Sequence, residues 1–189
     1  MNFVLFIYRE PFKTIIQLIE HLKQSHHQEM FVETQTFANW KDFVSWKEQE
    51  QTMNKCWFVK HRGDRKTKAH IVSWFYCNRS GFFKTRGNGK RSLNSQGSSK
   101  IHDYCSAFVT TRTDLVTGEV VAEYCLRHRG HKRELCFNRM SSELRLEVVA
   151  KLAQGVSMTN ILDSIRDSCV GPVKRDHLTS RKDLHNIKS

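Results

Sequence analysis

The chain has 189 residues and carries 31 Lys and Arg against 19 Asp and Glu, for a formal net charge of +12. With 39 % hydrophobic residues, nine glycines and two prolines it is not a largely disordered chain, and no stretch approaches the length of a membrane span. The apolar run at residues 2–8 is too short for a secretory leader, so the six cysteines predict a reducing compartment and no disulfide framework.

The excess positive charge is concentrated in the middle of the chain. Residues 1–57 sum to −1, residues 58–140 to +11 and residues 141–189 to +2. Within residues 58–100, eleven Lys and Arg accompany a single acid, Asp64. Such a block favours nucleic acid as a partner, through phosphate contacts and counterion release. The alternative is a solvated basic loop without a partner.

Residues 11–27 are predicted to form a helix, because apolar residues recur there near a period of 3.6. The spacing of Phe12, His21 and His26 also resembles the second half of a Cys2His2 finger. No cysteine precedes Cys56, so we interpret the segment as a truncated finger whose two histidines bind no zinc. The alternative is an amphipathic helix with incidental histidines.

A second helix is expected over residues 37–50, with Thr36 as its N-terminal cap. This helix carries an aromatic stripe made of Phe37, Trp40, Phe43 and Trp46. A stripe at this spacing favours a core-facing helix, and the alternative is an exposed surface for a protein partner.

Four segments are predicted strands, because they are apolar or alternate with a period of two. They are residues 58–63, 71–77, 104–111 and 119–127. Thr117-Gly118 is a turn signal, so the last two strands are expected to form a hairpin. The basic stretch 81–100, rich in Gly, Ser and Asn, is expected to be a long loop. Its glycines lack the strand-to-helix context of a phosphate-binding loop.

Four residues with metal-binding side chains lie on or beside these strands. Cys77, Cys105, His128 and His131 follow the spacing Cys-x27-Cys-x22-His-x2-His. Two thiolates and two imidazoles are a closed set that structural zinc uses, so we predict one Zn2+ at one edge of the sheet. Cys125 is the main rival ligand, because it stands three positions before His128. The alternative without a metal is that these cysteines are small buried hydrophobes.

The C-terminal part of the chain is predicted to be helical. A helix capped by Ser141 or Ser142 is expected to stop at Gly155, a second to begin at Ser157 and a short third at Thr179. The turn between the first two has a helix-turn-helix shape. The second helix is mainly apolar, however, and this favours packing over recognition of bases.

The segment Tyr76–Gly81, the step from Ser98 to Cys105 and the motif His128-Arg129-Gly130-His131 resemble the zinc domain of the WRKY, FLYWCH and far-red-response group. They are most similar to the version at the front of Mutator-like transposases. The resemblance covers roughly residues 58–140. It implies a small antiparallel sheet, one zinc and DNA binding. WRKY proteins have His-x-His where this chain has His-x-Gly-His.

The resemblance places a groove-reading strand at residues 58–63, ahead of the first ligand. We expect DNA contacts from Lys60, His61, Arg62, Lys66, Lys68, Arg79, Lys84 and Arg86. Lys60 and Arg62 are expected on the same face of the strand, where an arginine can read guanine while the other cations contact phosphates. The alternative is a plain edge strand whose charges only prevent aggregation.

Together these features predict an α+β chain, with a small antiparallel zinc-bound sheet flanked by N-terminal helices and a C-terminal helical segment. The expected segments are a finger helix over 1–27, an aromatic helix and linker over 28–57, the zinc-binding and DNA-binding domain over 58–140 and a helical linker over 141–189.

The predicted function is zinc-dependent binding of double-stranded DNA in the nucleus, by a chain derived from the N-terminal region of a transposase and lacking its catalytic domain. No enzyme is predicted, because the acids are scattered and the thiols and imidazoles are better used as zinc ligands. The alternatives are a protein adaptor acting through residues 37–50 and 141–168, a non-functional truncated transposon product, and RNA binding.

Overall fold

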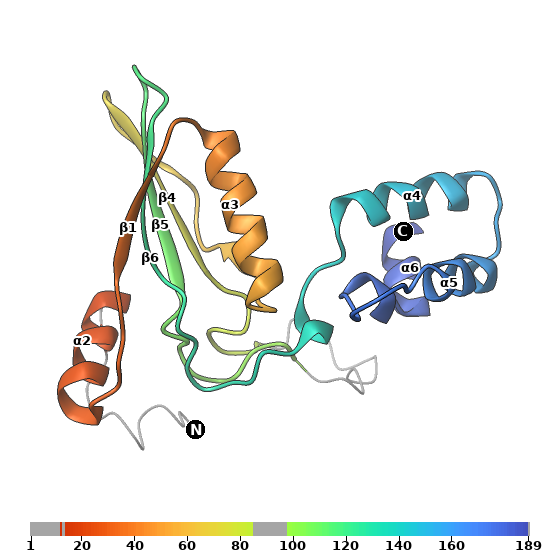
Figure 1. The fold of residues 1–189 in the computed structure, drawn as a ribbon, viewed down its shortest axis with the longest axis horizontal. Helices are drawn as coiled ribbons and strands as arrows, with labels where there is room; N and C mark the ends of the chain where they lie inside the picture. Colours follow the sequence, from red (N-terminus) through yellow and green to blue (C-terminus); the bar gives the residue numbers. More distant parts are fainter. Residues whose placement is uncertain (1–11, 13, 85–97, 189) are drawn as a thin grey trace. The chain divides into compact units, whose positions relative to one another are not determined.

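The computed structural model describes residue 12 and residues 14–84 and 98–188. It divides the chain into two compact units, residues 1–133 and residues 134–189. The first unit holds an antiparallel sheet of six strands with helices on both of its faces, and the second unit is helical (Figure 1). The predicted α+β class is therefore confirmed.

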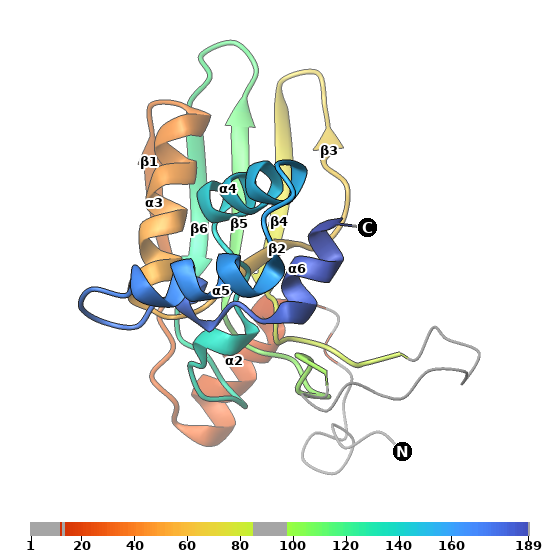
Figure 2. The same cartoon turned by 90° about the vertical axis from the view of Figure 1, so that its right-hand side faces the viewer.

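The sheet has the order β1-β6-β5-β4-β2, and β3 also pairs with β4 (Figure 2). Its strands are β1 (Glu33–Phe37), β2 (Phe58–Lys60), β3 (Arg65–Lys66), β4 (His70–Cys77), β5 (Phe108–Asp114) and β6 (Val120–Cys125). Because β5 occupies one side of β4, both β2 and β3 lie along its other side. These two short strands therefore form one edge of the sheet, as expected for the basic segment that begins at Phe58.

Strand β1 is not among the predicted strands. Four of its five residues are polar and exposed, so its sequence has no apolar alternation. It forms because it pairs with β6 along its whole length, from Glu33 opposite Tyr124 to Phe37 opposite Val120. This strand depends on pairing with a segment far away in the sequence. The local pattern of apolar and polar residues does not reveal such pairing.

Helix α3 (Trp40–Met53) begins three residues later than its predicted start. Thr36, the predicted cap, lies in β1. The cap is Asn39, whose side-chain oxygen accepts a hydrogen bond of 3.0 Å from the backbone N–H of Asp42. The helix starts later than predicted because pairing with β6 holds the chain extended up to Phe37.

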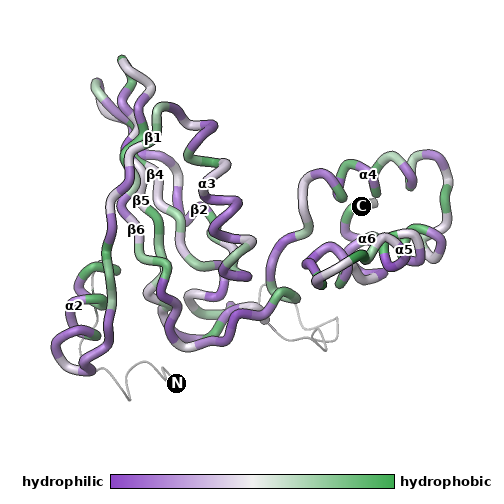
Figure 3. Tube along the Cα trace, viewed as in Figure 1, coloured by the Kyte–Doolittle hydropathy of each residue, from purple (hydrophilic) through white to green (hydrophobic). Residues whose placement is uncertain are grey.

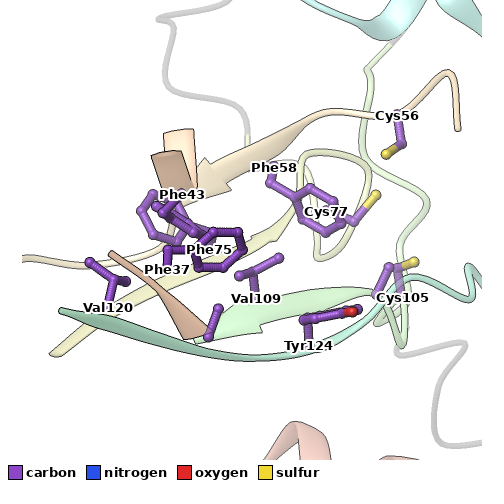
Figure 4. Close-up of a cluster of buried hydrophobic side chains, with 12 residues drawn as sticks. Phe37, Phe43, Cys56, Phe58, Phe75, Cys77, Cys105, Val109, Val120 and Tyr124 are labelled. Carbon is purple, nitrogen blue, oxygen red and sulfur yellow. The ribbon is translucent and has the colours of Figure 1, made fainter. Parts of the chain in front are cut away.

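Aromatic residues of α3 pack on one face of the sheet, and Figure 4 shows Phe43 against Phe37 and Phe75. Phe43 is completely buried, and its ring centroid lies 5.9 Å from that of Phe75 in β4. Trp46 packs on Tyr124 of β6 with a centroid distance of 4.8 Å. Gln51 fixes the far end of the helix, because its side-chain oxygen accepts a 2.8 Å hydrogen bond from the backbone of Phe58. The core-facing interpretation is confirmed for Phe43 and Trp46, whereas Trp40 is 41 % exposed and Phe37 lies in β1.

Helix α2 (Ile15–His26) packs on the opposite face of the sheet. Thr14 and Gln17 form a reciprocal capping box at its start. Its buried residues Leu18, Ile19 and Leu22 contact Phe108 and Cys125. These two partners pair with each other at the ends of β5 and β6, so α2 covers only one end of this face (Figure 1).

The second unit is a bundle of three helices around an apolar core. They are α4 (Ser142–Ala153), α5 (Met158–Asp167) and α6 (Arg181–Lys188), with single 3-10 turns at Leu135–Phe137 and Asp176–Leu178. Their buried residues are Val148, Ile161, Leu162, Ile165 and Leu184. Figure 3 shows hydrophobic and hydrophilic positions alternating along each helix, as in amphipathic helices.

Ser141 caps α4 and Ser157 caps α5, in agreement with the sequence. Ile161, Leu162 and Ile165 point into the bundle, so α5 uses its apolar positions for packing, as predicted. In the described parts of the chain, every helix is too short or too polar to cross a bilayer.

We expect replacement of Phe43 by alanine to cost about 3–5 kcal/mol of unfolding free energy, because it leaves a cavity between α3 and the sheet. Phe31→Ala is the matched control. Phe31 is 62 % exposed, so its loss should cost less than about 0.5 kcal/mol. Chemical denaturation of the zinc-loaded chain measures both, and equal effects would contradict this packing.

Candidate metal centre

The four predicted ligands lie at or near the ends of three neighbouring strands. β4 ends at Cys77, and β5 begins beside it because the two strands are antiparallel. Cys105 lies three residues before β5, and His128 lies three residues after the end of β6. The end of β4, the start of β5 and the end of β6 therefore meet at one end of the sheet. The antiparallel arrangement of the three strands therefore brings these distant residues to the same end of the sheet.

The ligand atoms of Cys77, Cys105, His128 and His131 all lie within 4.8 Å of one another. Nε2 of His131 is 3.4 Å from Sγ of Cys77 and 3.3 Å from Sγ of Cys105. Nδ1 of His128 is 3.4 Å from Sγ of Cys105. Two sulfurs on one tetrahedral zinc are about 3.8 Å apart. The group is thus close to the size of a zinc-binding tetrahedron, and the structure brings the four predicted side chains together.

The surroundings of the four side chains also fit a metal. Both cysteines are 99 % buried, and Figure 4 shows their side chains together beyond the aromatic core. Nδ1 of His131 lies 2.8 Å from the carbonyl oxygen of Lys132. A carbonyl only accepts, so Nδ1 carries the proton and Nε2 offers its lone pair to the centre. Nε2 of His128 is buried without a hydrogen-bond partner in the described structure.

The two thiols have opposite pKa shifts. A hydrogen bond from Cys105 lowers the pKa of Cys77 far below its usual value, and bonds from both histidines act in the same direction against the effect of burial. The same hydrogen bond and burial raise the pKa of Cys105. The lowered pKa favours the thiolate form of Cys77. A divalent cation bound at this group would favour the thiolate at both cysteines.

Hydrogen bonds from basic residues support the loops that carry the ligands. Nζ of Lys100 donates to the carbonyl oxygens of Asn78 at 2.9 Å and Ser80 at 2.8 Å. Nε of Arg79 donates to the carbonyl oxygen of Ser99 at 2.7 Å. These bonds tie the turn after Cys77 to the segment before Cys105. Sequence reasoning did not single out Lys100, because it is one of many cations in a basic stretch.

Two further contacts hold the turn between the histidines. Arg129 forms an ion pair of 3.0 Å with Asp103. Gly130 has a φ of +81°, and a Cβ atom there would lie 3.1 Å from Cδ1 of Ile101. Both the left-handed backbone and the close side chain favour glycine at this position. This is a physical reason for glycine in the His-x-Gly-His motif.

Cys125 does not belong to the metal group. Its side chain is fully buried on the face that α2 covers, beside Phe108, and burial raises the pKa of its thiol. Cys125 pairs with Phe108 in the ladder between β6 and β5, and this register turns its side chain toward α2. The sequence spacing to His128 does not reveal which face of the strand the thiol occupies.

Lys60 and Arg62 do not lie on one face, contrary to the prediction. Lys60 pairs opposite Phe75 on the α3 face, where its Nζ lies 2.6 Å from the Asp64 carboxylate. The guanidinium of Arg62 stacks on the other face, 3.7 Å from the ring centroid of Trp74. Regular pairing of the strand stops at Lys60, so the alternation assumed from the sequence does not continue to Arg62.

The other predicted DNA contacts are spread along the first unit. Lys66, Lys68 and Lys84 are exposed. His61 is exposed with its ring 4.6 Å from that of Tyr76. Arg79 is engaged in holding the metal-site loop, as described above, and Arg86 lies outside the described residues.

His21 and His26 share helix α2, as predicted, with ring centroids 5.1 Å apart. In the described ranges, no third residue joins them in a group of metal-binding side chains. The statement that they bind no zinc stays a prediction.

Comparisons with protein-family models, with curated proteins and with solved structures found no match to this chain. What the molecule shows by itself is a buried Cys2His2 group on an antiparallel sheet that could hold a metal ion, and its donor set favours zinc.

We expect one zinc per chain by elemental analysis, and chelation should lower the melting temperature, because structural zinc contributes folding energy. Cys105→Ser should remove the bound zinc. Cys125→Ala is the matched control, because it alters an equally buried thiol outside the group. Loss of zinc from the Cys125 variant with retention in the Cys105 variant would show that the ligand set is wrong.

Substitution His21→Ala should leave the zinc content unchanged, because two imidazoles without thiolates form an incomplete site. The measurement is zinc per chain after exhaustive dialysis. A second equivalent in the wild-type chain that disappears in this variant would overturn the truncated-finger interpretation.

Proposed function

We propose that this chain is a zinc-dependent binder of double-stranded DNA, derived from the N-terminal region of a transposase and acting in the nucleus without catalysis. The observation that carries the proposal is the position of the Cys2His2 group beside a basic sheet edge. Residues 58–84 carry seven Lys and Arg and one acid, and the two edge strands lie in this range. The family resemblance of residues 58–140 supports the same partner.

The metal centre contacts the first edge strand directly. Phe58 pairs with the ligand Cys77 and is 2 % exposed. Its ring centroid lies 6.1 Å from that of the ligand His128. Bound zinc would therefore hold the start of β2 in place. In this proposal the metal is structural, and it supplies rigidity to the edge rather than a contact to DNA.

The edge between β2 and β3 contains a bulge. Lys60 pairs with Phe75 and Arg65 pairs with Val72, so four edge residues oppose two residues of β4. Asp64 closes the bulge, because its carboxylate binds Lys60 and accepts a hydrogen bond from Ser73. These contacts lower the pKa of Asp64, with the bond to Lys60 as the main cause.

This bulge displays the residues that we assign to base recognition. His61 and Arg62 are exposed there, within reach of a major groove. Lys66, Lys68 and Lys84 are exposed and would contact phosphates on either side, which sets register without reading sequence. Because Lys60 is ion-paired with Asp64, we assign it a smaller part than the sequence suggested.

We assign no catalytic step to the chain. A transposase active site requires carboxylates gathered around a divalent metal. Among the described residues, the grouped metal-binding side chains are the two cysteines and two histidines of the zinc centre. Those thiols and imidazoles would be consumed as ligands, so they are not available as nucleophile and base.

A protein adaptor is the second candidate function, and one observation favours it. Leu146 is 70 % exposed and Val149 46 % exposed on α4, where their spacing of three places them on the same side of the helix. The aromatic helix α3 does not support this function, because Phe43 is fully buried. A non-functional truncated transposon product is the remaining alternative.

The test compares two single substitutions in the zinc-loaded chain, using duplex DNA from a random-site selection. Lys84→Ala should weaken binding to all sequences alike and reduce the salt slope by about one unit. Arg62→Ala should instead relax the base preference at one position, at a cost of about 1–3 kcal/mol.

If both substitutions weaken binding by the same factor on every duplex sequence, the edge contacts phosphates only and does not read bases. Absence of any salt-dependent duplex binding by the zinc-loaded chain would refute DNA as the partner.

A further inference from the structure

One half of the sheet face opposite α3 is uncovered by any described element of the first unit. Helix α2 contacts this face only near Phe108, Cys125 and Tyr76, at the zinc end (Figure 1). Toward the other end, the residues that point to this face are His70, Val72 and Trp74 in β4, Thr110, Arg112 and Asp114 in β5 and Val121 and Glu123 in β6. None of these eight is buried.

Three arginines lie beside Val72 and Trp74 on this uncovered face. Arg65 pairs opposite Val72, which in turn pairs opposite Arg112, so the two arginines stand in one row across the sheet. Two strand spacings separate their backbones by about 10 Å. Trp74 lies two residues along β4 from Val72, and Arg62 stacks over its ring at 3.7 Å. We name Arg62, Arg65, Trp74 and Arg112 the sheet-face patch.

The positive charge of the patch is not neutralised within the described structure. Arg65 and Arg112 are exposed, and neither side chain makes an ion pair or hydrogen bond to a described residue. Asp64 turns to the other face, where it binds Lys60 and Ser73. Asp114 lies on this face two residues along β5 from Arg112, but its carboxylate accepts hydrogen bonds from the backbone of Val116 and Thr117. Glu123 is one strand farther and lies diagonal to Arg112 in the ladder, without an ion pair to it. In the described structure the three arginines of the patch therefore have no ion pair with an acid.

From this arrangement we propose that the sheet-face patch binds single-stranded nucleic acid. Arg65 and Arg112 bind phosphates of the strand, and a base stacks on the Arg62–Trp74 pair, either on the guanidinium plane or on the indole after Arg62 moves aside. Single strands are bound in this way, by cations that follow the backbone and planar groups that stack unpaired bases. A paired base in a duplex offers no free face to such a platform.

This inference goes beyond duplex recognition and uses a surface that shares only Arg62 with the proposed duplex contacts. The patch extends from Arg62 and Arg65 at the edge onto the sheet face at β4 and β5. Arg65, Trp74 and Arg112 have no part in the proposed duplex contacts. Failure of one proposal is distinguishable from failure of the other, because the single-strand test uses Arg112 and Trp74 and the duplex test uses Arg62 and Lys84.

The experiment measures binding of the zinc-loaded full chain to labelled twelve-nucleotide oligo-dT and oligo-U by fluorescence anisotropy at several salt concentrations. We expect both to bind, and Arg112→Ala to weaken binding and reduce the magnitude of the salt slope by about 0.7, the value for one phosphate contact on a single strand. Trp74→Leu should weaken binding about five- to hundredfold through the lost stack.

Arg145→Ala is the matched control, because it removes an equally exposed arginine from α4 in the other unit. It should leave the affinity unchanged. If the Trp74 variant loses zinc or melts early, Arg112→Ala decides the question, because Arg112 is exposed and its removal leaves the core intact. A preference for oligo-U over oligo-dT would assign part of the contact to the 2′-hydroxyl and supports the proposal, as equal binding does.

Three results would overturn the proposal. The first is no binding of either oligonucleotide at low salt. The second is an equal loss of affinity in the Arg112 and Arg145 variants. The third is a loss on duplex DNA as large as that on single strands in Arg112→Ala, which would make the patch part of a duplex site. Binding of a poly-glutamate peptide at the patch, with no binding of oligonucleotides, would assign it to an acidic protein instead.

Discussion

Two buried thiols facing each other constrain this fold. Cys77 and Cys105 are almost completely inaccessible to solvent, and the pKa of Cys77 is lowered while that of Cys105 is raised. Two thiolates in such a place would repel each other unless a cation lay between them, and His128 and His131 complete a ligand set for it. A metal ion bound there would join the ends of three strands at one centre.

Strand β4 joins the metal-binding end of the sheet to the two surfaces for which we propose nucleic-acid binding. Cys77 lies at one end of this strand, the bulged basic edge runs along its side, and Trp74 projects from its uncovered face. Helix α3 supports β4 from the opposite face through Phe43 and Phe75. The uncovered part of the sheet face presents charged side chains at the spacings of the strands, because packing of α3 on the other face keeps β4 in place.

Local chemistry in the sequence predicted the α+β class, the four ligands and the aromatic helix, because ligand types, periodicity and caps are local properties. It did not predict β1, whose polar residues form a strand only through pairing with β6. The face on which Cys125 lies depends on register, and the separation of Lys60 from Arg62 depends on a bulge. These features depend on contacts between segments that are far apart in the chain. Local patterns in a single sequence do not reveal such contacts.

The central claim is that a single zinc ion joins these three strand ends through two sulfurs and two nitrogens. X-ray absorption at the zinc edge of the purified full-length chain tests this directly. The account predicts two sulfur ligands at about 2.3 Å and two nitrogen ligands at about 2.0–2.1 Å. A spectrum with a single sulfur, with three or four sulfurs, or with oxygen ligands only would contradict it, as would a chain that folds to the same stability with no metal bound.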